Sequence, residues 1–204
     1  MTSWKNNNVL ASRKLVEEVL DLTSESERIV ARDKGHLREL IKERIAKFGP
    51  NCDLNDIDVS NVTDMSELFR DSSFNGSISQ WDVSNVRDMH DMFYKSKFNG
   101  DISNWDVSKV KNMENMFSFS KFNKDISRWN VSSVRDMGRM FLGSNFDKDI
   151  SGWNVSNVRY MGYMFYKSKF RGDISKWNVL SVEDMSHMLA GSPLKGKEPD
   201  WYKE

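Results

Sequence analysis

The sequence predicts a right-handed α/β repeat solenoid of six 24-residue coils, with a helical cap at its N-terminal end. Tryptophan returns every 24 residues, and valine, methionine and phenylalanine return with the same period and in fixed phase. The tryptophan column consists of Trp81, Trp105, Trp129, Trp153 and Trp177. Because a unit this small cannot bury its own apolar face, its stability must come from the units stacked on either side.

Each unit is expected to contain a short strand followed by a short helix. In residues 78–83, which read Ile-x-x-Trp-x-Val, the alternating tryptophan and valine favour a strand. Residues 86–93 then place valine, methionine and phenylalanine on one stripe of about two helical turns. Asn85 stands at the expected N-cap of this helix. Residues 95–101 return the chain to the next strand.

The N-terminal end of the stack is expected to carry a helical cap, because an open solenoid end exposes its core. Asp33 is placed as an N-cap, and residues 37–48 carry an apolar stripe that Gly49-Pro50 brings to an end. Upstream, residues 15–20 predict a shorter amphipathic helix, and residues 28–31 predict an extra strand that feeds the cap.

At the other end, the repeat loses its pattern after Leu189. Pro199, Trp201 and Tyr202 follow, which indicates an irregular aromatic lid. The chain therefore divides into a helical cap at residues 1–50, a six-coil solenoid at residues 51–194 and an aromatic cap at residues 195–204.

Composition narrows the classes of partner. Thirty basic and thirty acidic side chains cancel, so no bulk field attracts nucleic acid or an anionic membrane. The first residues lack the apolar run of a secretory signal, and the single cysteine, Cys52, forms no internal disulfide. The chain as written is therefore expected to be cytoplasmic, or to lie at the cell surface or be secreted if an export signal has been removed.

No recurring set of residues predicts catalysis or a cofactor. Serines repeat without a histidine beside them, and the sequence contains no Gly-rich phosphate loop, CxxC pair or HExxH motif. A column of aspartates, Asp101, Asp125, Asp149 and Asp173, admits a calcium site between coils as one interpretation. The alternative is that each carboxylate accepts a backbone hydrogen bond two residues on, and Ser77 in the first copy favours this turn role. We expect a non-enzymatic protein without cofactor or metal.

The candidate binding residues are those that vary between copies, because a position fixed by stacking is not free to suit a partner. Aromatic and arginine side chains are enriched in protein interfaces. They recur at the variable positions Tyr94, Phe119, Arg139, Tyr163 and Tyr166, which form the predicted patch. Beside them runs a basic column of Arg87, Lys111, Arg135 and Arg159.

The segment WDVSNVRDMHDMF, followed by FNGDIS, resembles the repeat of the BspA-like leucine-rich-repeat surface proteins. The resemblance extends over about residues 33–204. It implies a solenoid of the leucine-rich-repeat kind and no catalytic residues. Members of that family are commonly bacterial cell-surface or lipid-anchored proteins that bind proteins of a host or a neighbouring cell.

The leading hypothesis is a protein-binding solenoid, an intracellular effector or inhibitor that sterically occupies another protein. It is expected to be a monomer or weak oligomer that binds neither nucleic acid nor membrane. One alternative is an adhesin-like bacterial surface protein whose export signal is missing. A second alternative is nucleic-acid binding through the basic column, and its mark would be strong dependence on salt.

Overall fold

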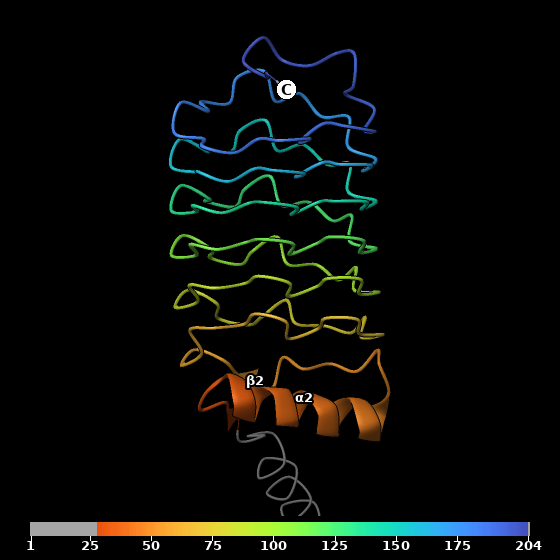
Figure 1. Cartoon of the computed structure of the whole chain (residues 1–204). Coiled ribbons are helices and arrows are strands. Elements are labelled where there is room, and N and C mark those ends of the chain that lie inside the picture. The colour runs from red at the N-terminus through yellow and green to blue at the C-terminus, as the bar shows by residue number, and fades with distance from the viewer. Residues whose placement is uncertain (1–27, 204) are drawn as a thin grey trace, which may run out of the picture.

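The computed structural model describes residues 28–203, which wind into stacked coils between an N-terminal helix and C-terminal loops (Figure 1). Isolated parallel bridges join residues 24 positions apart, for example Asp88 with Asn112 and Asn112 with Asp136. The bridges continue in this way from Asp64 to Asp184. The period of the sequence is therefore the period of the stack, and equivalent residues of successive coils lie above one another.

The N-terminal end is covered by α2 (Lys34–Phe48), the one α-helix among residues 28–203. Its N-cap is Asp33, whose side chain accepts a hydrogen bond from the backbone N–H of His36 at 2.8 Å. It ends at Gly49, where φ is +84° and the backbone N–H donates to the carbonyl of Ile45. Both predicted ends of this helix are confirmed.

A short strand precedes this helix. β1 (Ile29–Val30) pairs in parallel with β2 (Ile57–Asp58) of the first coil. The extra strand predicted here is confirmed, and it adds one rung to the stack before the first coil. The helix expected at residues 15–20 lies outside the described residues.

The interior of each coil differs from the expected strand and helix. Residues 59–203 contain neither element, and turns follow one another instead. In the second coil the Met92 N–H donates to the Met89 carbonyl at 3.2 Å, which is a turn contact, whereas the N–H groups of Met89 and Phe93 donate to the next coil. A helix would direct these groups to carbonyls four residues earlier in the same coil.

Backbone conformation explains why the helix prediction was wrong. Asp91 and Lys95 are left-handed, with φ of 56° and 52°, so a right-handed helix cannot run through them. Met89, Met92 and Phe93 still point into the core and are fully buried. A series of turns therefore produces the same inward spacing as a helix, and the hydrophobic pattern alone does not separate the two.

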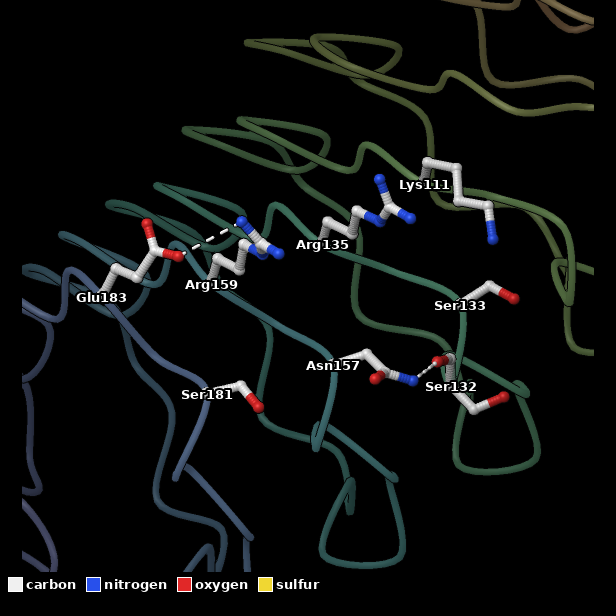
Figure 2. Close-up of a pocket in the computed structure, with 8 residues that line it drawn as sticks. All are labelled: Lys111, Ser132, Ser133, Arg135, Asn157, Arg159, Ser181 and Glu183. Atoms are coloured by element: carbon white, nitrogen blue, oxygen red, sulfur yellow. Dashed lines mark hydrogen bonds and ion pairs between the residues drawn. The ribbon is translucent and has the colours of Figure 1, made fainter.

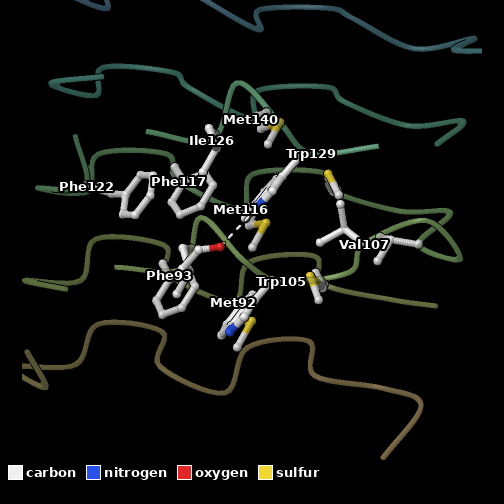
Figure 3. Close-up of a cluster of buried hydrophobic side chains, with 14 of the residues drawn as sticks. Met92, Phe93, Trp105, Val107, Met116, Phe117, Phe122, Ile126, Trp129 and Met140 are labelled. Atoms are coloured by element: carbon white, nitrogen blue, oxygen red, sulfur yellow. Dashed lines mark hydrogen bonds between the residues drawn. The ribbon is translucent and has the colours of Figure 1, made fainter. Parts of the chain in front are cut away.

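The core consists of columns of equivalent side chains (Figure 3). Phe93 and Phe117 stack with ring centroids 5.6 Å apart and ring planes inclined by 4°. The buried Trp105 donates its indole N–H to the carbonyl of Ile78 at 3.1 Å, and the equivalent bond recurs at Trp129, Trp153 and Trp177. Each tryptophan therefore supplies apolar area and also binds its coil to the preceding one.

The C-terminal segment continues this tryptophan column. Trp201 lies 24 residues after Trp177, and its indole N–H donates to the carbonyl of Ile174 at 3.2 Å. Trp201 and Tyr202 also pack against the core. The predicted aromatic lid thus repeats one contact of an ordinary coil, a relation that the 24-residue spacing already contained.

Candidate partner-binding surface

Two columns on the outer side of the coils combine left-handed backbone with side chains at or near the surface. Values of φ from 51° to 70° occur throughout them, in Asp91, Asn115, Arg139, Tyr163 and His187, and in Lys95, Phe119, Gly143, Lys167 and Gly191. Few residue types other than glycine and asparagine adopt this conformation readily. The hydrogen bonds between coils maintain it, so these side chains stand on a backbone of fixed geometry.

Phe119 is the most prominent apolar side chain of the predicted patch. It is 50% exposed, and its ring meets that of Tyr94 edge-on with centroids 6.2 Å apart. A Cβ atom at Gly143 would lie 2.5 Å from the Phe119 ring. The glycine of the next coil therefore makes room for this ring. The guanidinium of Arg70 lies over the Tyr94 ring, 4.6 Å from its centroid.

The other predicted residues form a second cluster. The Tyr163 and Tyr166 rings are 5.5 Å apart, and the guanidinium of Arg139 lies 5.6 Å from the Tyr163 centroid. Arg139 also forms an ion pair with Glu114 at 2.9 Å. The structure therefore brings the predicted residues together as two groups on different coils, Tyr94 with Phe119 and Arg139 with Tyr163 and Tyr166.

The basic column borders a separate hollow of about 480 Å³, which we call the basic groove. Its lining residues are Lys111, Ser132, Ser133, Arg135, Asn157, Arg159, Ser181 and Glu183. The charged side chains form one row and the serine and asparagine side chains a second row (Figure 2). Arg87 lies outside the lining and continues the column by one coil, since its carbonyl accepts from the Lys111 N–H at 2.8 Å.

The second row of the groove is not among the candidate binding residues predicted from the sequence. Ser133 and Asn157 each lie two residues before a position of the basic column, and Ser181 lies two residues before Glu183. That spacing was the available signal, because side chains two positions apart on extended backbone share a side.

A smaller hollow of about 180 Å³ was not predicted. Gly138 and Gly162 occupy a column that elsewhere holds serine, histidine or glutamate, and the missing side chains leave space beside Asp136, Arg139 and Tyr163. Burial raises the pKa of Asp136, against the hydrogen bond that its carboxylate accepts from the Gly138 N–H.

The aspartate column forms turns, as the turn interpretation predicted. The Asp101 carboxylate accepts the backbone N–H of Ser103 at 2.9 Å, and this bond lowers the pKa of Asp101. The same contact recurs at Asp125, Asp149 and Asp173. Within residues 28–203, no group of three or more histidine, cysteine, aspartate or glutamate side chains is arranged to hold a metal ion.

The helix content also bears on membranes: in the part of the chain that the structure describes, no helix has the length and apolar character to cross a bilayer.

Comparison with known proteins gives one match. The family described as "Mycoplasma protein of unknown function, DUF285" matches residues 37–145 and again residues 118–201. No curated protein and no solved structure matches the chain. The two matches overlap within the repeat stack, and together they extend over most of the 204-residue chain. The chain therefore belongs to this bacterial repeat family of unknown function.

Proposed function

We propose that this protein is a non-enzymatic binding module that recognises another protein through the outer face of its stacked coils. The observation that carries this proposal is Phe119, a half-exposed aromatic ring held between Tyr94 and the backbone of Gly143. An apolar side chain that is already ordered loses little conformational freedom on binding, which favours affinity. Aromatic and arginine residues of this kind supply most of the binding energy in many interfaces.

The proposed mechanism is steric, with the module occupying a surface of an intracellular partner as an effector or inhibitor. The alternative within the same class is a bacterial surface protein of the BspA-like leucine-rich-repeat type, which would present this face outside the cell. Surface labelling of intact source cells separates the two, because only the second exposes the chain to a reagent that does not cross membranes.

The test is capture of proteins from source cells by the wild-type chain and by a Phe119→Lys variant. Lysine occupies the equivalent left-handed position at Lys95 and Lys167, so this variant is expected to keep the fold. We expect the captured protein to bind the Phe119→Lys variant at least tenfold more weakly than wild type, the loss typical of a central interface residue. The matched control is Lys124→Ala, an exposed change away from this face. Equal binding by Phe119→Lys and wild type would contradict the proposal.

Mapping the contact extends the test to both clusters. A variant with Tyr94, Phe119, Tyr163 and Tyr166 changed to alanine should bind less than Phe119→Lys, provided that its circular dichroism and melting curve remain those of a folded protein. A partner that binds this variant unchanged would place the interface elsewhere on the stack.

A further inference from the structure

The basic groove carries an excess of positive charge that the protein does not neutralise. Arg159 forms an ion pair with Glu183 at 3.3 Å. The side chains of Lys111 and Arg135 form no ion pair or hydrogen bond with any residue in 28–203, and the same holds for Arg87. By contrast, Arg139 and Arg171 are each paired with a carboxylate of a neighbouring coil.

Stacking forces these cations together. The Arg135 N–H donates to the Lys111 carbonyl at 2.9 Å, and the Arg159 N–H donates to the Arg135 carbonyl at 2.8 Å. Residues joined in this way lie on adjacent rungs, about 4.8 Å apart. Like charges carried on adjacent rungs repel one another, so the column opposes the stacking that holds the coils together. An anionic ligand would remove that repulsion.

The second row of the groove offers hydrogen-bond donors from which a carboxylate can accept. The hydroxyl groups of Ser133 and Ser181 make no hydrogen bond with the described residues and lie on the side of the hollow facing the cations (Figure 2). A carboxylate accepts hydrogen bonds from guanidinium, ammonium and hydroxyl groups alike. The groove therefore combines charge and donors suited to carboxylates.

We propose that the basic groove binds an acidic segment of a partner protein, with successive carboxylates on Lys111 and Arg135. This inference rests on the proposed protein-binding function and specifies the chemistry of one part of the partner. Side chains at positions i and i+4 of a helix have Cβ atoms about 5–6 Å apart, close to the spacing of the rungs that carry the cations. The groove contains no aromatic side chain on which a nucleic-acid base would stack.

The experiment measures binding of a fluorescent ten-residue polyglutamate peptide to the full chain by anisotropy, at low and at physiological salt. The test variant is Lys111→Gln with Arg135→Gln. Its control is Lys124→Gln with Arg128→Gln, which removes the same charge from a hollow that also contains Asp101 and Asp125. We expect the test variant to lose at least tenfold in affinity and the control to lose less than threefold. Equal losses in both variants would overturn the proposal.

Melting temperature without ligand gives a second, independent measurement. At low salt the Lys111→Gln, Arg135→Gln variant should melt above wild type, because its charge column no longer repels, while the control variant should not. A test variant that melts below wild type would show that the basic column does not destabilise the stack, and this would overturn the proposal.

Two further arms separate the possible ligands and the two proposals. A single-stranded DNA oligonucleotide of equal charge that binds tighter than polyglutamate, through the same two residues, would assign the groove to nucleic acid and contradict the proposal. Phe119→Lys should bind polyglutamate as wild type does. Loss of partner capture by Phe119→Lys with polyglutamate binding intact supports the aromatic face independently of the groove. Partner capture that stays unchanged in Phe119→Lys, with polyglutamate binding lost in the Lys111→Gln, Arg135→Gln variant, would contradict the aromatic face and support the groove.

Discussion

At the N-terminal end of the stack, α2 and β1 take the place of a neighbouring coil, whereas at the C-terminal end a loop segment covers only part of the last coil. Leu37 of α2 is fully buried, and β1 supplies a parallel rung of two residue pairs. In the last coil, Val182 and Met185 are only partly buried, although their equivalents Val158 and Met161 are fully buried.

Polar contacts follow the same division. Lys34 of α2 forms an ion pair with Asp64 of the first coil at 3.2 Å, and Arg44 pairs with Asp56. At the other end, Trp201 repeats the tryptophan bond while Leu180 remains 93% exposed. The difference teaches that a capping helix can close a whole coil, while one repeated side chain closes only the side on which it lies.

The largest expected effect comes from opening the N-terminal end. Leu37→Ala removes a fully buried side chain between α2 and the first coil, and should lower the free energy of unfolding by about 2–5 kcal/mol. Denaturant unfolding measures this, with Glu43→Ala on the exposed side of the same helix as the control. A loss below that of the control would mean that the cap contributes little to the stability of the stack.

A smaller effect is expected at the C-terminal end. Trp201→Ala removes one indole hydrogen bond and a partly buried ring, so we expect a loss of about 1–3 kcal/mol, below that for a fully buried tryptophan. Hydrogen exchange of the Trp201→Ala variant, compared with wild type, should accelerate more for backbone amides of the last coil than for those of the first coil. Uniform acceleration along the whole stack would show instead that the two ends unfold as one unit.

The smallest effect concerns pH and Asp184, on the exposed edge of the last coil. The Ser186 N–H donates to this carboxylate at 2.9 Å and lowers its pKa in the folded state. A lowered folded pKa contributes stability above the unfolded pKa of about 3.9, and the contribution is lost as pH falls through the folded value. Asp184→Asn should therefore reduce the loss of stability between about pH 5 and pH 2.

Asparagine is a suitable replacement because Asn112 accepts the equivalent N–H in an interior coil at 3.0 Å. Melting temperatures of both proteins across this pH range make the comparison. Parallel curves for Asp184→Asn and wild type would show that this carboxylate does not contribute to the acid response.

The basic groove shows how far sequence reasoning reached for a site. The repeat period placed Lys111, Arg135 and Arg159 in one column, and the structure does place them in one hollow. The aromatic side chains of the predicted patch form two clusters, Tyr94 with Phe119 and Tyr163 with Tyr166, a grouping that the sequence does not contain. Which surface side chains touch depends on rotamers and on small neighbours such as Gly143, and the period of a repeat contains no information on either.

The sequence by itself determined the period, the buried columns and the ends of α2, because spacing and capping are local properties of the chain. Only the tertiary structure decided that residues 86–96 form turns, with left-handed backbone at Asp91 and Lys95, instead of a helix. Helical and turn backbones both direct Met89, Met92 and Phe93 inward, and the choice between them rests on where the N–H groups find acceptors. Those acceptors lie in the next coil, on Asn112, Glu114 and Met116, and exist only once the coils have stacked.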